Sequence, residues 1–226
     1  MCIRDSYVHL QTKSSIDTKT IKVLNPKEVV FEGGRELKLD AVSEVPRYYV
    51  YNAYGVCGIY SAPGTAVKEA YDTSGIVTND RGVTVWLKGN RVSRNQIMAI
   101  KEENVTEQKN SLAVCLDNIL RHAGITRNTE YDLAQGKTAT TILSENMTGV
   151  QVLDLSGCTL DAVLYYVNQD IPVLAILDDG EAVLVTGFNE FNVVIMEPAT
   201  GKLYKKGMND ATAWFAENGN HFVTYM

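Results

Sequence analysis

The residues of this sequence that could do chemistry lie in its second half. Two nucleophiles, Ser111 and Cys115, stand one turn apart on an expected helix. The side chains that could assist them are His122, His221, Asp178, Asp179, Glu181 and Glu197. A hydroxyl or thiol becomes a useful nucleophile only with a base within hydrogen-bond reach, so the positions of these groups decide which reactions are open.

Within the helix itself, no catalytic pair is expected. His122 lies seven residues after Cys115, which is about 10 Å along a helix and too far for a hydrogen bond. Cys115 shares an apolar face with Leu112 and Ile119, a pattern that favours core packing. His122 is expected at the helix end, and Ser111 is most simply a cap with Asn110 beside it. His221, on a terminal strand, is expected at the surface.

Metal, disulfide and cofactor chemistry find no support in the sequence. Cys2, Cys57, Cys115 and Cys158 show no CxxC spacing, so neither a zinc site nor a disulfide framework is expected, and no cofactor is predicted. The DDGE run at 178–181 lacks a calcium-loop pattern and favours an exposed turn, although Ca²⁺ bound by these carboxylates is an alternative.

Charge separates the two halves of the chain. Residues 1–100 hold 13 basic and 10 acidic residues, and residues 101–226 hold 8 and 17. With a net charge of −6 and no basic stripe, neither nucleic acid nor an anionic membrane is an expected partner. No apolar stretch approaches the roughly 18 residues that a membrane span needs.

The first half predicts small β-rich pieces. The opening MCIRDS resembles a translated sequencing-adapter remnant, so residues 1–12 are expected to be an artefact or tail, and the true N-terminus to be missing. Residues 13–46 read as a β-hairpin around Gly33-Gly34, or the end of a preceding β module. Residues 47–92 predict a ββαββ module whose helix is capped by Ser61. Its six tyrosines between Tyr48 and Tyr71, with Trp86, could instead bind cell-wall glycan.

The second half predicts helices first and an antiparallel sheet second, an α+β arrangement. After a linker at 93–104, helices are expected at 111–123, 128–135 and 138–147. A strand at 150–155 precedes a helix capped by Thr159, and residues 172–204 predict three strands. A last helix starts at Asn209, and residues 221–226 form the closing strand.

Three segments in this order carry a family resemblance: NSLAVCLDNILRHAG, EAVLVTG and MEPATG. They resemble the bacteriocin-processing peptidases that cut double-glycine leaders, cysteine peptidase family thirty-nine of the papain-like clan. The resemblance covers about residues 105–226. It implies a papain-like domain, with N-terminal helices packed on an antiparallel sheet.

When these segments are matched to the family, each position that holds a catalytic residue in the family holds another residue type in this sequence. The nucleophile position is Ser111, the histidine position is Glu181, and the position of the carboxylate that orients the histidine is Glu197. The glutamine that donates to the oxyanion falls on Val105, which has no side-chain donor. A glutamate ordinarily titrates near about 4.3, so it is a weak base at neutral pH, and two carboxylates would oppose a developing oxyanion.

The sequence therefore predicts a catalytically degenerate peptidase-like domain that binds a peptide or serves as a structural module. The setting that we expect is a bacterial cell-surface or secreted protein. One alternative is an active peptidase that uses Ser111 or Cys115. A second alternative is an adhesion or glycan-binding protein that works through the tyrosine-rich module.

Overall fold

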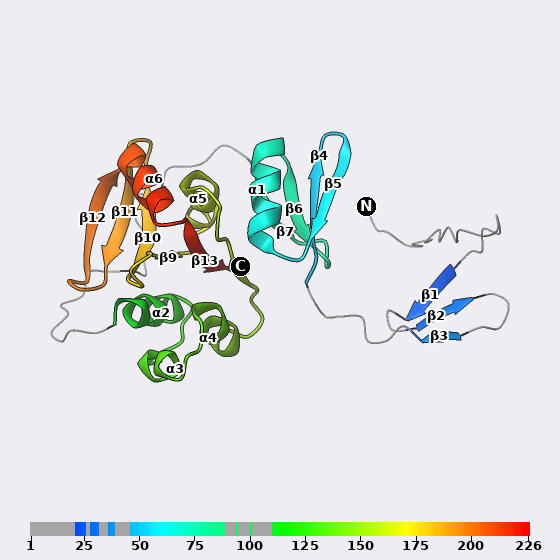
Figure 1. Ribbon diagram of the computed structural model, residues 1–226, viewed down its shortest axis with the longest axis horizontal. Coiled ribbons are helices and arrows are strands. Elements are labelled where there is room, and N and C mark those ends of the chain that lie inside the picture. The colour runs from blue at the N-terminus through cyan, green and yellow to red at the C-terminus, as the bar shows by residue number, and fades with distance from the viewer. Residues whose placement is uncertain are drawn as a thin grey trace. The chain divides into compact units, whose positions relative to one another are not determined.

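The computed structural model describes residues 46–88, 94, 100 and 110–226, and the backbone of three strands in the first 45 residues (Figure 1). The chain divides into two compact units, residues 1–45 and residues 46–226. Within the described parts, no helix is long and apolar enough to cross a lipid bilayer.

The first unit contains a three-stranded antiparallel sheet. Its strands are β1 (Ile21–Asn25), β2 (Glu28–Phe31) and β3 (Glu36–Lys38), in the order β1-β2-β3. The hairpin expected here corresponds to β2 and β3, whose connection at 32–35 lies outside the described residues, as do residues 1–20. The structure adds β1 as a third strand paired with β2.

A four-stranded antiparallel sheet with one helix opens the second unit. Its elements are β4 (Tyr48–Asn52), β5 (Gly55–Tyr60), α1 (Pro63–Thr73), β6 (Ile76–Asn79) and β7 (Thr84–Leu87), and the strands lie in the order β5-β4-β6-β7. The cap expected at Ser61 is wrong, because Ala62 is the N-cap residue and no side chain caps α1. Pro63 opens the helix, where its missing N–H needs no partner.

The rest of the unit is a six-stranded antiparallel sheet with helices. The strands are β8 (Val152–Asp154), β9 (Val173–Ile176), β10 (Ala182–Phe188), β11 (Asn192–Glu197), β12 (Lys202–Gly207) and β13 (His221–Tyr225), in the order β12-β11-β10-β9-β13-β8. The helices are α2 (Ser111–His122), α3 (Glu130–Ala134), α4 (Ala139–Asn146), α5 (Leu160–Asn168) and α6 (Met208–Glu217). Thr159 caps α5 by accepting a hydrogen bond from the Ala162 N–H.

Strand β12 was not expected as a separate strand. The sequence predicts three strands over 172–204, and the structure forms β9, β10 and β11 there and begins a fourth at Lys202. The run KLYKKG has little of the apolar periodicity that marks a strand, because β12 is an edge strand with exposed Lys202 and Lys205. Helix α6 begins at Met208, one residue before the expected start.

Strand β10 lies at the centre of the core. All seven of its residues are buried, and both α2 and α5 pack against it. Because alternate side chains of a strand point to opposite faces, complete burial means that both faces of the sheet are covered at β10. Figure 1 shows α2, α3 and α4 grouped beside one another and apart from α5 and α6.

Polar side chains join the four-stranded sheet to the rest of the second unit. Trp86 donates its indole N–H to the Ala162 carbonyl at 3.0 Å, and its ring is 2% exposed. The buried Tyr48 accepts a hydrogen bond from the Gln151 amide at 2.8 Å. A Cβ on Gly64 of α1 would lie 3.0 Å from the Ser156 carbonyl, so the backbones approach closely. Trp86 therefore faces the interior, and its ring is not accessible to a glycan.

The expected linker at 93–104 contributes two described residues to the packed structure. The backbone of Arg94 forms two hydrogen bonds with Phe188 at the end of β10, of 2.9 and 2.6 Å. Its guanidinium contacts Asp170 at 3.3 Å and donates to the Asn168 carbonyl at 2.9 Å. Ile100 is 1% exposed. The chain is thus attached to β10 at Arg94 and enters the hydrophobic core at Ile100.

Candidate functional site

The candidate site is built on the N-terminus of α2. The Asn110 side chain caps the helix by accepting hydrogen bonds from the N–H groups of Leu112 at 2.9 Å and Ala113 at 3.2 Å. The expected cap at Ser111 is therefore provided by its neighbour Asn110, and Ser111 is the first helical residue. This leaves the Ser111 hydroxyl free to turn toward the sheet.

Ser111 meets the start of β10. Its Oγ accepts a hydrogen bond from the backbone N–H of Ala182 at 3.0 Å, across 71 positions of sequence. Ala182 directly follows Glu181, so the structure brings the first two positions of the family register, Ser111 and Glu181, to neighbouring places. The hydroxyl acts here as an acceptor from a backbone donor, which is a structural role.

Glu181 ends an exposed turn. Its N–H donates to Asp179 Oδ1 at 3.0 Å, and its carbonyl accepts from the Leu177 N–H at 2.7 Å. Gly180 has a φ of +84°, a conformation that glycine adopts without strain. Asp178, Asp179 and Glu181 are all exposed. Across the described residues, no group of three or more His, Cys, Asp or Glu side chains could hold a metal ion.

Glu197 binds its own turn. It is exposed at the end of β11, and its Oε2 accepts a hydrogen bond from the Thr200 hydroxyl at 2.7 Å. Burial, with a smaller contribution from the Glu197 charge, raises the pKa of Tyr204. The carboxylate thus stabilises the connection from β11 to β12. Among the described residues, no histidine forms a hydrogen bond or ion pair with it.

Cys115 lies in the core, one turn after Ser111. Its side chain is fully buried, and burial, followed by the negative charge of Glu181, raises the pKa of its thiol well above the ordinary value. Glu181 directly precedes Ala182, whose N–H binds Ser111 at the start of the same helix. Because the thiolate is the reactive form, this environment makes Cys115 a poor nucleophile.

Neither described histidine reaches Ser111. His122 lies eleven residues further along α2, about 16 Å by the helical rise, and its Nδ1 is 2.7 Å from the Tyr225 hydroxyl. Burial lowers the pKa of His122, and the charge of Asp170 partly opposes this. His221 is exposed on β13. It lies opposite Ile176 of β9, which in turn lies opposite Ala182 of β10, so two strand spacings, roughly 10 Å, separate His221 from Ala182. His9 and Val105 lie outside the described residues.

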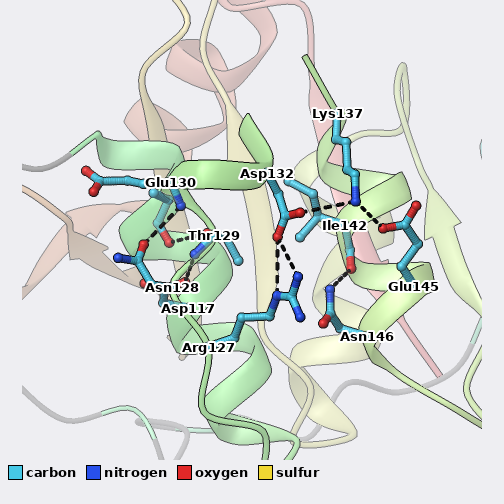
Figure 2. A network of polar contacts seen from close by, with 11 residues as sticks. Asp117, Arg127, Asn128, Thr129, Glu130, Asp132, Lys137, Ile142, Glu145 and Asn146 are labelled. Atoms are coloured by element: carbon cyan, nitrogen blue, oxygen red, sulfur yellow. Dashed lines mark hydrogen bonds and ion pairs between the residues drawn. The ribbon is translucent and has the colours of Figure 1, made fainter. Parts of the chain in front are cut away.

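An ionic network holds the segment between α2 and α4 (Figure 2). Asp132, 5% exposed, accepts hydrogen bonds from Arg127 at 3.0 and 3.2 Å and lies 3.1 Å from the Lys137 ammonium. Lys137 also binds Glu145 of α4. The Arg127 hydrogen bond, followed by that of Lys137, lowers the pKa of the Asp132 carboxyl. This network was not predicted from the sequence, although the charged residues over 127–145 could have indicated it.

The same segment is attached to α2 by Thr129. Its N–H donates to Asp117 Oδ1 at 2.9 Å, and its hydroxyl donates to the Ala113 carbonyl at 3.3 Å. Thr129 is completely buried. The first half of α2, which carries Ser111, is therefore fixed by the sheet at Ala182 and by this segment, whose Thr129 contact with Asp117 is drawn in Figure 2.

Comparison with known proteins supports the fold. No family model and no curated protein matches the chain. The crystal structure of a candidate C39-like peptidase from Bacillus anthracis is similar, with a TM-score of 0.51, over 60% of this chain and 98% of that chain. The two sequences are 12% identical, so the likeness shows the fold alone. The chain thus has a peptidase-like fold of the α+β class with antiparallel sheets.

Proposed function

We propose that residues 105–226 are a peptidase-like domain without peptidase activity, which binds a peptide segment or acts as a structural module. The observation that carries this proposal is the hydrogen bond from the Ala182 N–H to Ser111 Oγ at 3.0 Å. It engages the hydroxyl at the nucleophile position with a backbone donor, while no imidazole lies within hydrogen-bond reach of it in the described part of the chain.

The electrostatics around Ser111 support the same proposal. Acyl transfer develops negative charge on the substrate oxygen, and an active site places donors or positive charge there. Glu181, which directly precedes the Ala182 that binds Ser111, contributes negative charge instead, and this charge also raises the pKa of Cys115. The Ser111 hydroxyl therefore gains no assistance in losing its proton.

The competing candidate nucleophile, Cys115, is disfavoured by burial. A catalytic thiol needs access to substrate and a lowered pKa, and Cys115 has neither. The peptide-binding part of the proposal rests on fold analogy with peptidases, and so does the cell-surface or secreted setting. The excess of acidic over basic residues in 101–226, 17 against 8, favours a neutral or basic peptide over an acidic one.

Digestion of a complex peptide library by the full chain, read by mass spectrometry, tests the proposal. Ser111→Ala and Cys115→Ala variants are run beside it, and circular dichroism confirms that all three proteins are folded. We expect the same library profile with and without each protein. Cleavage by the unmodified chain that disappears in either variant would establish an active peptidase and overturn the proposal.

The same library separates the two forms of the proposal. Peptides retained by the immobilised full chain indicate a peptide-binding module, and a matched Glu181→Gln variant reports whether the retained peptides lie at the start of β10. If nothing is retained by a folded chain, the structural role is the one supported.

A further inference from the structure

Exposed apolar side chains gather on the four-stranded sheet. Of the nine large apolar side chains that are exposed among the described residues, six belong to this sheet and its turns. They are Tyr54, Val56, Ile59, Ile76, Val83 and Leu87. Monomeric proteins rarely expose contiguous apolar patches larger than a few hundred Å², and the largest patch on a protein often marks an interaction site.

The strand register places most of these side chains on one face. Val56, Tyr51, Ile76 and Leu87 are directly opposite one another across the four strands, and Ile59, Tyr49, Thr78 and Thr84 form the next row. Directly opposite residues of antiparallel strands share a face, so these eight side chains form one surface, called here the outer face. The inner face, which includes Tyr48, Val50 and Trp86, is buried.

The sequence of these strands is that of a sheet covered on both sides. A sheet with one wet face alternates apolar and polar residues, whereas β4 reads YYVYN and β7 reads TVWL. The same continuous pattern occurs in β10, AVLVTGF, where α2 and α5 cover both faces. In the four-stranded sheet α1 packs on all four strands, and the outer face has no cover among the described residues.

The outer face also lacks charge. None of its eight residues is ionisable at neutral pH, although the chain as a whole has a net charge of −6. A charged partner would find nothing to pair with here, and a glycan would find only two tyrosine and two threonine hydroxyls. A two-fold contact brings the same surface of both copies together, so an uncharged apolar face is the part of an acidic molecule that can meet itself without repulsion.

We propose that the outer face is a contact with a second copy of this chain, in which two four-stranded sheets pack face to face. Four strands about 4.8 Å apart, with about five residues of about 3.3 Å each, make a face of roughly 300 Å². Two copies bury roughly 600 Å² or somewhat more, less than the about 1,200 Å² of a stable interface, so the dimer is weak and reversible.

Sedimentation equilibrium of the full chain from about 10 µM to about 1 mM tests this contact, a range that brackets weak association. The weight-average mass is expected to rise from the 25.0 kDa of one chain toward twice that value. Ile59→Lys and Ile76→Lys place a charge on the outer face and are expected to keep the mass at that of the monomer. Thermal unfolding confirms that both variants are folded.

Phe191→Lys is the matched control, because Phe191 is 70% exposed in the turn between β10 and β11, away from the outer face. It is expected to associate like the unmodified chain. The proposal is overturned if the unmodified chain stays monomeric at about 1 mM, or if Phe191→Lys prevents association as strongly as Ile76→Lys. A monomeric chain that binds soluble cell-wall glycan, and loses that binding in Tyr51→Ala, would assign the face to glycan instead.

Discussion

The Ser111 hydroxyl serves as a link between α2 and β10. It gives the Ala182 N–H an acceptor at a point where β10 begins and the neighbouring strand β11 has already ended. A hydrogen bond of this kind contributes about 1 kcal/mol to stability, and its removal leaves a partly buried donor without a partner. The residue at the nucleophile position can therefore be assigned a measurable structural role.

Ser111→Ala is expected to lower the free energy of unfolding by about 1 kcal/mol, because the Ala182 N–H loses its acceptor. Urea denaturation at pH 7 measures the change. Ser144→Ala, at an exposed position on α4, is the control and should leave the midpoint unchanged. Equal midpoints for Ser111→Ala and the unmodified chain would contradict the structural role.

The thiols are expected to differ sharply in reactivity. Cys57 is exposed, whereas Cys115 and Cys158 are buried, and burial raises the pKa of Cys158 to about 12. At pH 8, alkylation by iodoacetamide followed by peptide mapping should modify Cys57 at least tenfold faster than the two buried thiols. If Cys115 reacts as fast as Cys57, it is an accessible nucleophile, and the peptidase hypothesis based on Cys115 gains support.

At the scale of elements, the network around Asp132 fixes α3 between α2 and α4. A short helix of five residues has little stability by itself, so its position depends on contacts such as those of Arg127 and Lys137. A folded-state pKa below the unfolded value means that the ionised carboxylate stabilises the fold. This contribution is present above the ordinary value near 3.8 and is lost as pH falls through the lower folded-state pKa.

Asp132→Asn is therefore expected to destabilise the protein at pH 7, and the difference from the unmodified chain should shrink as pH falls below about 4. Urea midpoints measured at a series of pH values test this. Glu130→Gln removes an exposed charge from the same helix and is the control. A difference that stays constant across the series would show that the Asp132 carboxylate is not the group responsible.

Local signals predicted many elements correctly and failed where tertiary contacts decide. The cap of α5 at Thr159 and the order of elements from β4 through β11 followed from capping chemistry and periodicity, whereas β1 was not predicted. Strand β12 was missed because an exposed lysine-rich edge has no apolar period. The register that brings Ser111 beside Glu181 came from the family resemblance, since no local rule joins residues 70 positions apart.

At the scale of the whole molecule, the tyrosine-rich module and the peptidase-like part belong to one compact unit. The sequence predicted separate pieces because its linker is polar. It could not place Trp86, since both faces of β7 are apolar and either could have faced solvent. The structure buries Trp86 against α5 and leaves Leu87 exposed.

Trp86→Ala is expected to destabilise the unit by about 3 to 5 kcal/mol, the usual cost of removing a large buried ring. Tyr54→Ala, at a side chain that is 98% exposed, is the control and should change stability little. Thermal unfolding followed by tyrosine fluorescence and by far-ultraviolet circular dichroism should give one shared transition. Two separate transitions, with only one shifted by Trp86→Ala, would indicate independent modules.

The contacts of Trp86, Tyr48 and Gly64 with the segment 151–162 have a practical consequence for expression. A fragment that begins at residue 105 would leave the Ala162 carbonyl and the Gln151 amide without these partners, and would expose the side of α5 that Trp86 covers. Such a fragment is expected to collect in inclusion bodies. A fragment that begins at Pro46 keeps every one of these contacts, so Pro46 is the N-terminal boundary to use for crystallisation.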